Sequence, residues 1–286
     1  MKIRNTVPLA TATVLLASVV PGVASNGERV QPTNQSVGDT SRIVDPTWKT
    51  YSTTVGRGTK INVSTGGNIT SFASPNEAKG SYEHIGVGAI GEGYVLCYNG
   101  GSPAYDLGES SSGWAAPTTT SSAVTRNTLD GKITMIQNFN LMVGTSTVPT
   151  FFTVQMTLVN RTSQTLNNVV LRRQVDFDID TGGTAGWAGF LSNHTRTKGT
   201  VSAFHDPVEA PTGKESHGIM MMVMQSGGKW ETRVTNSILD STCNPTPAPL
   251  GASFVARGDY GDTMIFPIGS IPGGGSKTVS LRYMRY

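Results

Sequence analysis

Charged residues are scarce in this sequence of 286 residues, since Asp, Glu, Lys and Arg together make up 14% of it. The basic residues are scattered, with Arg172-Arg173 as their one adjacent pair, and the formal net charge is +3. Proteins that bind nucleic acid usually carry a basic run or a strongly basic face. The sequence therefore predicts no nucleic-acid partner.

Helical patterns and long apolar runs are also missing after residue 30. The chain has 34 Gly and 15 Pro, and Thr, Ser, Val and Asn are frequent where a helical protein would be rich in Glu, Lys, Leu and Ala. No segment beyond the N-terminus has the roughly 20 apolar residues that span a bilayer. We expect an all-β protein with few or no helices and no membrane span.

Cysteine is limited to Cys97 and Cys243. In an oxidising compartment the two can form one disulfide, which would stabilise the fold by roughly 4 to 5 kcal/mol on the chain-entropy account of such a long loop. Two unpaired thiols, with Cys97 buried in a strand, are the alternative. The sequence slightly favours the disulfide.

The N-terminus has the pattern of a secretion signal. Lys2 and Arg4 precede the mostly apolar stretch 7–20, and small residues follow Pro21-Gly22, so cleavage is expected near Ser25. Export would leave 22 basic residues less Lys2 and Arg4, against 19 acidic ones, and a net charge of +1. We expect a secreted protein, extracellular or periplasmic.

Composition divides the whole chain into three parts. Residues 1–25 are the predicted signal peptide, 26–47 a flexible polar leader, and 48–286 a single domain. Within 48–286, short β-prone runs alternate with turn signals, and no repeat of fixed period is found. Some twelve to sixteen strands without helices predict a large antiparallel β-sandwich of the supersandwich kind.

Three hairpins are expected from turn residues. Thr65-Gly66-Gly67 separates two β-prone runs, and Asp130-Gly131 is a typical hairpin turn. The clearest candidate joins 151–160 with 166–180 through the loop 161–165. Apolar residues alternate along both arms, as in strands with one buried face.

The second arm of that hairpin carries the densest charge in the chain. Val175, Phe177 and Ile179 alternate with Asp176, Asp178 and Asp180, so a strand would place the three apolar residues in the core and the three carboxylates on the other face. Calcium is one interpretation, because carboxylate oxygens suit Ca²⁺ and Asp-x-Asp-x-Asp-x-Gly resembles the front of a calcium loop.

The remainder of a calcium loop is absent, since Thr181 and Trp187 stand where Gly and Glu are required. Alternate carboxylates on a strand also lie about 7 Å apart, too far for three to hold one ion without a bend. A solvent-facing ladder paired with Arg172, Arg173 or other cations, and a pair of catalytic carboxylates of the glycosidase type, are the alternatives. Glu92 is one candidate for the second carboxylate of such a pair.

Trp114 and Trp187 are the candidate carbohydrate-binding residues, because both are expected in loops where an exposed ring can stack on a sugar. The alternative for each is a ring packed over the end of a sheet. The histidines do not have metal-ligand spacing and are expected to form local hydrogen bonds; they are His84, His194, His205 and His217.

Four short segments carry a resemblance to a known group. They are Gly67-Asn68-Ile69-Thr70-Ser71-Phe72, His84-Ile85-Gly86-Val87-Gly88, Gly91-Glu92-Gly93-Tyr94 and Thr157-Leu158-Val159-Asn160. Together with the Asp-rich segment they resemble secreted bacterial β-sandwich proteins of unassigned activity, which are similar to the large sandwich of the galactose-mutarotase-like group. The resemblance covers residues 60–205 and implies the fold. It assigns no catalytic residue, because no local motif places a His and a Glu for proton transfer at a sugar ring.

These observations favour a secreted β-sandwich protein that binds, or interacts at a surface with, extracellular carbohydrate. The first alternative is a carbohydrate-active enzyme, of hydrolase or epimerase type, using carboxylates near Asp176–Asp180. The second is a structural envelope or matrix protein.

Overall fold

The structure is a computed structural model, and all that it describes belongs to one compact unit, Pro32–Tyr286. The described residues are 45–55, 58–77, 80–85, 92–108, 110–145, 149–177, 179, 193–197, 200–204, 218–224, 229–235, 237, 240–248, 255–257 and 260–285. The predicted signal peptide and almost all of the predicted leader lie outside these ranges and stay predictions.

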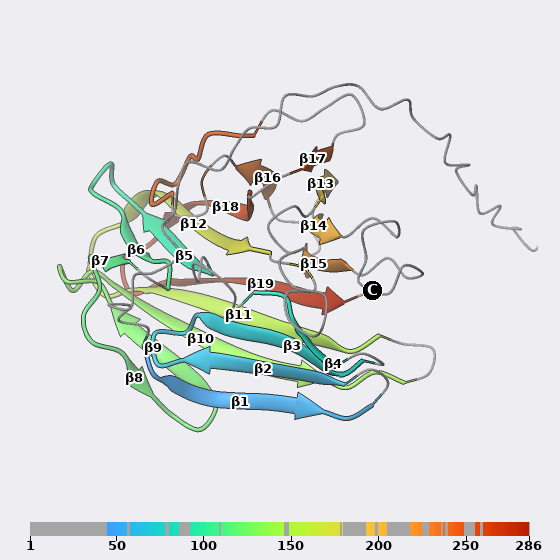
Figure 1. The fold of residues 1–286 in the computed structure, drawn as a ribbon. Coiled ribbons are helices and arrows are strands. Elements are labelled where there is room, and N and C mark those ends of the chain that lie inside the picture. Colours follow the sequence, from blue (N-terminus) through green and yellow to red (C-terminus); the bar gives the residue numbers. More distant parts are fainter. Residues whose placement is uncertain are drawn as a thin grey trace, which may run out of the picture. The chain divides into compact units, whose positions relative to one another are not determined.

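Three antiparallel sheets make up this unit (Figure 1). The four-stranded sheet has the order β1 (Thr47–Thr53), β2 (Thr59–Ser64), β3 (Ile69–Glu77) and β4 (Gly80–Glu83). The nine-stranded sheet has the order β17 (Val255–Arg257), β13 (Asn193–Thr197), β14 (Thr200–Phe204), β15 (Gly218–Val223), β19 (Ser276–Arg285), β11 (Phe151–Asn160), β10 (Ile133–Met142), β9 (Ala123–Asn127) and β8 (Thr118–Thr119). The six-stranded sheet has the order β16 (Glu231–Thr235), β18 (Gly261–Ile271), β12 (Leu166–Asp176), β5 (Gly93–Cys97), β6 (Ala104–Asp106) and β7 (Ser111–Ser112).

The described ranges contain strands, turns and bends but no helix, so the all-β prediction is confirmed. A search of the same ranges for a helix that is long and apolar enough to cross a membrane finds none. Apolar side chains from all three sheets pack into one buried cluster, with Val63 from β2, Leu171 from β12 and Leu281 from β19 among its members. The sheets therefore share a core, as expected of a sandwich.

Two of the three predicted hairpins are confirmed. β2 and β3 pair across the turn at Gly67, and β9 and β10 pair across Asp130-Gly131. Gly67 and Gly131 have φ values of 89° and 70°, a conformation that side chains other than glycine rarely adopt. At Gly67 a Cβ would also overlap the side chain of Gln137, so glycine is required there twice over.

The third hairpin prediction is wrong. β11 pairs with β10 and β19 in the nine-stranded sheet, whereas β12 pairs with β5 and β18 in the six-stranded sheet. The loop 161–165 thus carries the chain from one sheet to another. Alternation shows that one face of each strand is buried, but it does not identify the hydrogen-bonded neighbour.

The connection between β18 and β19 makes the same crossing, and Asn160 fastens the two connections together. Its Nδ2 donates hydrogen bonds to the carbonyl oxygens of Gln164 at 2.7 Å, Ile271 at 2.9 Å and Pro272 at 3.0 Å. Its Oδ1 accepts from the backbone nitrogen of Thr162 at 2.9 Å and from the Thr162 hydroxyl at 2.8 Å. One buried amide therefore satisfies five polar groups where β11 and β18 both leave their sheets.

The Cys97–Cys243 disulfide is formed, as the sequence slightly favoured. It joins the end of β5 to the segment 240–248, across a sequence separation of 146 residues. Disulfides of this kind persist in oxidising compartments. The bond is consistent with an extracellular or periplasmic protein.

The substitution Asn160→Asp tests the role of the amide at the crossings. The variant keeps the shape of the side chain but replaces the NH₂ donor with an acceptor facing three carbonyl oxygens, so we expect the free energy of unfolding to fall by about 2 to 4 kcal/mol. Urea denaturation measures this loss. Asn138→Ala, at a partly exposed amide of β10, is the control and should change stability by under about 0.5 kcal/mol. Equal losses in the two variants would contradict the role of Asn160.

Candidate functional site

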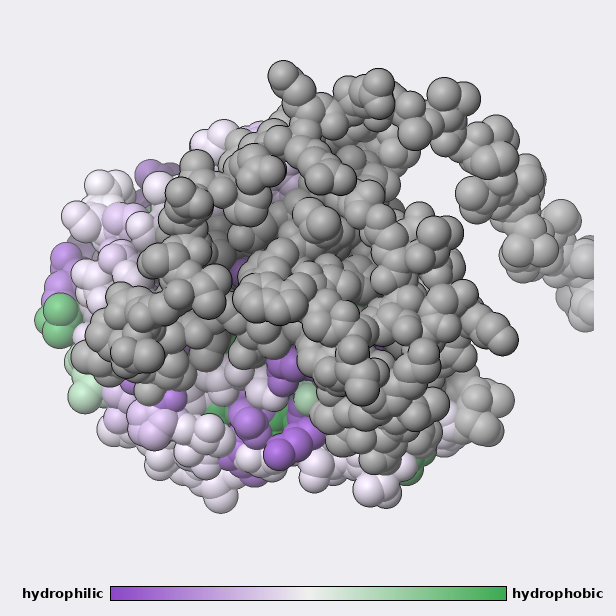
Figure 2. Space-filling model, in the orientation of Figure 1, coloured by the Kyte–Doolittle hydropathy of each residue, from purple (hydrophilic) through white to green (hydrophobic). Residues whose placement is uncertain are grey.

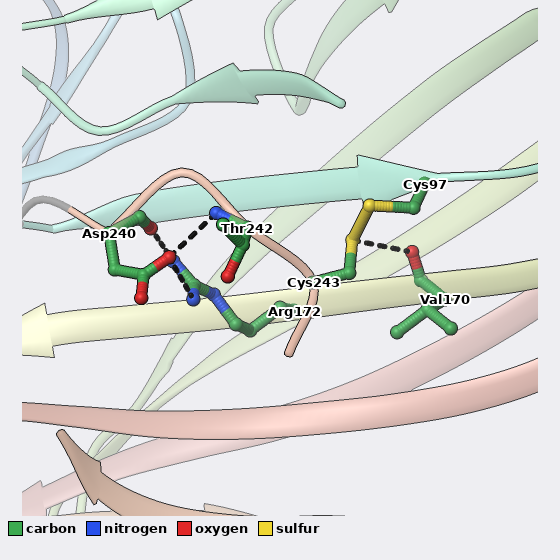
Figure 3. Close-up of a disulfide and its surroundings, with 6 residues drawn as sticks. All are labelled: Cys97, Val170, Arg172, Asp240, Thr242 and Cys243. Atoms are coloured by element: carbon green, nitrogen blue, oxygen red, sulfur yellow. Dashed lines mark hydrogen bonds and ion pairs between the residues drawn. A yellow bond between two sulfur atoms is a disulfide. The ribbon is translucent and has the colours of Figure 1, made fainter. Parts of the chain in front are cut away.

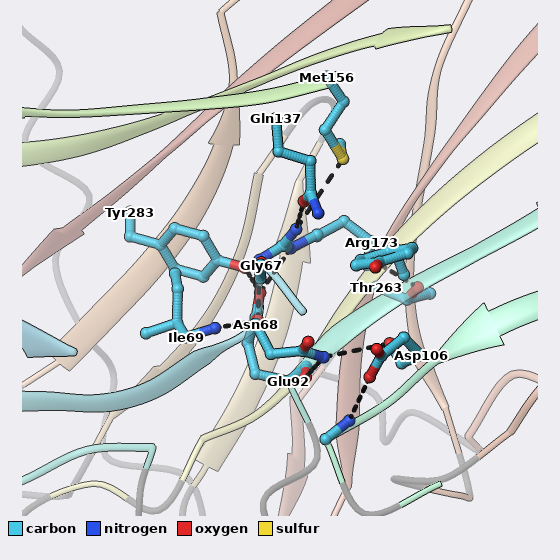
Figure 4. A network of polar contacts seen from close by, with 12 residues as sticks. Gly67, Asn68, Ile69, Glu92, Asp106, Gln137, Met156, Arg173, Thr263 and Tyr283 are labelled. Atoms are coloured by element: carbon cyan, nitrogen blue, oxygen red, sulfur yellow. Dashed lines mark hydrogen bonds and ion pairs between the residues drawn. The ribbon is translucent and has the colours of Figure 1, made fainter. Parts of the chain in front are cut away.

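A fully buried ion pair lies where the three sheets meet (Figure 4). Arg173 of β12 donates from Nε to Glu92 Oε1 at 2.5 Å and from Nη2 to Glu92 Oε2 at 2.8 Å. Glu92 directly precedes β5, the neighbour of β12. The two parallel hydrogen bonds give the pair the bidentate geometry in which arginine binds a carboxylate most strongly.

Groups from the other two sheets complete the ion pair. The backbone nitrogen of Ile69 in β3 donates to Glu92 at 2.6 Å, and the hydroxyl of Tyr283 in β19 donates to it at 2.7 Å. Arg173 also donates to Gln137 Oε1 in β10 at 2.7 Å, to the Gly67 carbonyl at 3.1 Å and to the sulfur of Met156 in β11 at 3.9 Å. The pair, which belongs to the six-stranded sheet, therefore has hydrogen-bond partners from both of the other sheets. In the absence of water, such partners are what make a buried pair of charges tolerable.

Burial and the charge of the partner shift the pKa values of Glu92 and Arg173 in opposite directions. Burial raises the pKa of the Glu92 carboxyl, while the Arg173 charge and the hydrogen bonds to the carboxylate partly lower it. For Arg173, burial lowers the pKa, but Glu92 and Tyr283 together outweigh burial, and the pKa rises. Burial, with the Glu92 charge, raises the pKa of Tyr283 well above its usual value. Tyr283 therefore acts as a hydrogen-bond donor.

A second buried ion pair adjoins the first. Asp106 at the end of β6 pairs with Arg126 of β9, and Arg126 Nη1 also donates to the Tyr94 hydroxyl at 3.3 Å. Asn68 connects the two pairs, since its Nδ2 donates to the carbonyl oxygens of Glu92 at 2.8 Å and Asp106 at 3.2 Å. The result is one continuous buried polar network.

Trp114, a predicted sugar-stacking residue, lies against this network. Its side chain is 7% exposed, and its ring packs edge-on against Tyr94 with the centroids 5.5 Å apart. The guanidinium of Arg126 lies 5.9 Å from the Trp114 ring, within range of a cation–π interaction. The ring thus has the packed position that the alternative interpretation gives it, and stacking on a sugar would require it to leave Tyr94.

The Asp-rich segment is described only in part. Val175, Phe177 and Ile179 are buried, as predicted. Asp176 is the last residue of β12 and is 3% exposed, so the interpretation as a solvent-facing ladder is wrong at this position. The reason is that β12 lies inside its sheet and is covered on both faces, which a polar side chain in the sequence does not reveal.

Asp178, Asp180 and Trp187 lie outside the described residues, so a calcium site at Asp176, Asp178 and Asp180 stays a prediction. Where the structure does describe the chain, no three His, Cys, Asp or Glu side chains lie close enough together to hold a metal ion. The described histidine side chain, His84, makes the expected local hydrogen bond, with Nε2 3.0 Å from Ser74 Oγ. His205, His217 and the side chain of His194 lie outside the described parts.

The network of Glu92 and Arg173 was not identified from the sequence. The signal was present, because Arg173 occupies a core position between Leu171 and Val175 in the alternation of β12. The sequence indicates Glu92 only as part of the segment Gly91-Glu92-Gly93-Tyr94 and as a candidate second carboxylate for catalysis. Its carboxylate is fully buried and held by four hydrogen bonds, so the described arrangement positions the sheets and exposes no group for acid–base chemistry.

A double-mutant cycle tests the ion pair. Glu92→Gln and Arg173→Met each leave one buried charge without its partner, so we expect each to lower the free energy of unfolding by roughly 3 to 5 kcal/mol. The double variant should lose clearly less than the sum of the two, since it leaves neither charge unpaired. Lys132→Met, which removes an exposed pair with Asp130 at 3.1 Å, is the control and should cost less than about 1 kcal/mol. Additive losses would argue against the coupling.

Chelation tests the calcium prediction. If Asp176, Asp178 and Asp180 bind calcium, saturating Ca²⁺ stabilises the folded state by roughly 3 kcal/mol at a hundredfold excess over Kd, and the melting temperature rises by several degrees. EDTA should reverse this rise in the purified protein, and Asp178→Asn should abolish it. A melting temperature that does not respond to either Ca²⁺ or EDTA would exclude the site.

Comparison with known proteins yields only a weak likeness in structure. No family model and no curated protein matches the chain. Among solved structures the chain is similar to a polysaccharide lyase, with 12% identity, a TM-score of 0.39 and coverage of 76% of this chain and 30% of the lyase chain. The chain thus spans less than a third of the length of that lyase. A likeness at this level assigns neither activity nor substrate, and the resemblance to the galactose-mutarotase-like group stays a prediction.

Proposed function

We propose that this is an exported binding protein whose ligand is an extracellular carbohydrate, bound on the open face of the nine-stranded sheet. This face is formed by alternate residues of three adjacent strands, which are half-buried or exposed while their neighbours are buried in the core. It is called the outer face below and comprises Ile136, Asn138, Asn140, Thr153, Gln155, Thr157, Thr278, Ser280 and Arg282.

The outer face has a regular arrangement, which is the observation that carries the proposal. Asn138 lies opposite Gln155, and Gln155 opposite Ser280, so one row of hydrogen-bonding side chains crosses β10, β11 and β19. Parallel rows contain Thr153 and Thr157. Neighbouring strands lie about 4.8 Å apart, and same-face residues about 7 Å apart along each strand. The sheet thus holds amide and hydroxyl groups at fixed spacings.

These groups suit a sugar better than a nucleic acid or an ion. Amide and hydroxyl side chains both donate and accept hydrogen bonds, which matches the hydroxyl groups of a carbohydrate. Arg282 is the charged member of the outer face, and its guanidinium lies 5.2 Å from the ring centre of Phe151. Because rigid strands hold the side chains, ordering them on binding costs little.

The surface chemistry and the predicted export support an extracellular ligand. On the side of the molecule seen in Figure 2, the described residues are mostly hydrophilic or near neutral, with a few separate hydrophobic ones. The described part of that side therefore has no broad apolar patch of the kind used for large protein interfaces. The predicted signal peptide would deliver the protein to the compartment where polysaccharides and the Cys97–Cys243 disulfide occur together.

An enzyme and a structural protein remain the alternative proposals, and each predicts a different experimental result. An enzyme using carboxylates near Asp176–Asp180 would release sugar products from a polysaccharide, whereas a binding protein would not. A structural protein would show neither release nor saturable binding. Trp187 stays a proposed contact residue, and Trp114 joins it only if its ring can leave Tyr94.

A polysaccharide array with the purified protein tests the proposal. We expect saturable binding to at least one polysaccharide, and binding at least about fivefold weaker in the double variant Asn138→Ala/Gln155→Ala, because two hydrogen bonds of roughly 0.5 to 1.5 kcal/mol each are lost. Asn167→Ala, at an exposed amide of β12, is the control and should bind normally. Trp187→Ala and Trp114→Ala, with their folding checked by circular dichroism, test whether each of the two rings contributes to binding. Blank arrays, or equal binding by the double variant, would refute the proposal.

A further inference from the structure

The segment 240–248, called the strap below, crosses the face of β12 that points away from Glu92 (Figure 3). Its central attachment is the disulfide from Cys243 to Cys97 at the end of β5. Farther along, the Ala248 nitrogen donates to the Val234 carbonyl at 2.8 Å. A covalent bond and a backbone hydrogen bond therefore hold the strap over the six-stranded sheet.

Arg172 is fully buried beneath the strap. One Nη2 hydrogen bond goes to the backbone carbonyl of Asp240, and Nη1 lies 3.5 Å from the Asp240 carboxylate. Nη2 also donates to Gln174 Oε1 at 2.5 Å. The Asp240 carboxylate is itself held in the strap by the Thr242 nitrogen at 2.7 Å. The strap thus supplies both the cover and the counter-charge of this arginine.

A second arginine also holds the strap. Arg233 of β16 donates from Nη1 to Asn244 Oδ1 at 2.7 Å and to the Pro245 carbonyl at 2.8 Å. Its Nε pairs with Glu231 at 2.5 Å. Two guanidinium groups therefore lie against the strap, and most of their contacts with it are to backbone carbonyls and an amide.

Burial beneath the strap is electrostatically unfavourable for the charged form of Arg172. Burial, together with the Arg233 charge, lowers its pKa to about 10 against the opposing effect of Asp240. Within the described residues, Arg172 Nε has no hydrogen-bond partner. Opening the strap would return this cation to water, which favours opening. The disulfide opposes it by keeping the strap in place.

We propose that the Cys97–Cys243 disulfide is a redox-controlled latch that keeps the strap over a concealed arginine surface. An external dithiol reductant supplies two electrons and two protons, the S–S bond becomes two thiols, and the reductant becomes a disulfide. Both cysteines are half-buried rather than fully enclosed, and thiol–disulfide exchange depends on such access. Without the bond the strap detaches from β5, Arg172 becomes hydrated, and Arg172 and Arg233 form an exposed cationic surface.

Chemical modification tests the proposal, with the neighbouring arginine as an internal control. Arg172 lies under the strap, whereas Arg173 lies in the core on the opposite face of the same strand. The full-length protein, oxidised or treated with dithiothreitol, is exposed to an arginine-selective dicarbonyl reagent and analysed by tandem mass spectrometry. We expect Arg172 to react at least tenfold faster after reduction, and Arg173 to stay protected in both states.

Two variants separate the effect of the disulfide from that of the Arg172–Asp240 ion pair. Cys97→Ser/Cys243→Ser should reproduce the reduced state, with exchange of the Ala248 amide hydrogen at least tenfold faster and exchange in β10 and β11 unchanged. Asp240→Asn keeps the disulfide and should leave Arg172 protected within about twofold. The proposal is overturned if Arg172 stays protected after reduction, or if Arg173 and the β10 amides lose protection together with it, because the bond would then be passive or a staple of the whole fold.

Discussion

The Glu92–Arg173 ion pair is the constraint on which the arrangement of the three sheets depends. Both charges are removed from water, and such charges are tolerated only when hydrogen bonds complete them. Ile69 comes from the four-stranded sheet, and Tyr283 and Gln137 come from the nine-stranded sheet. A shift of either sheet relative to β12 would leave a buried charge incompletely bonded, so the pair fixes position as well as contributing to stability.

The adjacent residue, Arg172, is also a buried charge, but it is paired in a different way. Arg172 points to the opposite face of β12, where its counter-charge comes from Asp240 in a loop rather than from a neighbouring sheet. The loop is fastened by a disulfide, which a reductant can open, whereas the core pair has no comparable release. Two successive arginines of one strand thus lie in two different settings: a rigid core on one face, and on the other the strap that we propose to be removable.

The path of the chain determines which faces remain available for binding. The connections at which β11 and β18 leave their sheets are tied together by Asn160. β12 is an inner strand of its sheet because β5 and β18 pair with it on either side, while β10, β11 and β19 keep an open face. That open face carries amides and hydroxyls in rows, and its rigidity comes from the same core that the ion pair organises. The proposed carbohydrate binding and the proposed redox latch therefore concern different sheets and can be tested independently.

Much of the fold was predictable from local patterns. Alternating apolar residues located β11 and β12, and Gly67 and Asp130-Gly131 gave the correct hairpin turns, because turn conformation and side-chain period are local properties. The scarcity of charge and of helix-forming patterns gave the all-β class. The spacing of the two cysteines gave no test of their bond, which depended on whether the folded chain brings β5 and the strap together.

Tertiary structure alone decided which strands pair with one another and whether the polar side chains are buried. The sequence around 151–180 fits a hairpin and a crossing between sheets equally well, because both bury one face of each strand. Asp176, Arg172 and Arg173 look alike as charged residues in an alternating run, yet all three are buried, and the two arginines find their counter-charges 81 and 68 residues away. Local sequence determines whether a strand forms and which residues share a face, but burial on the second face depends on what the distant chain places over it.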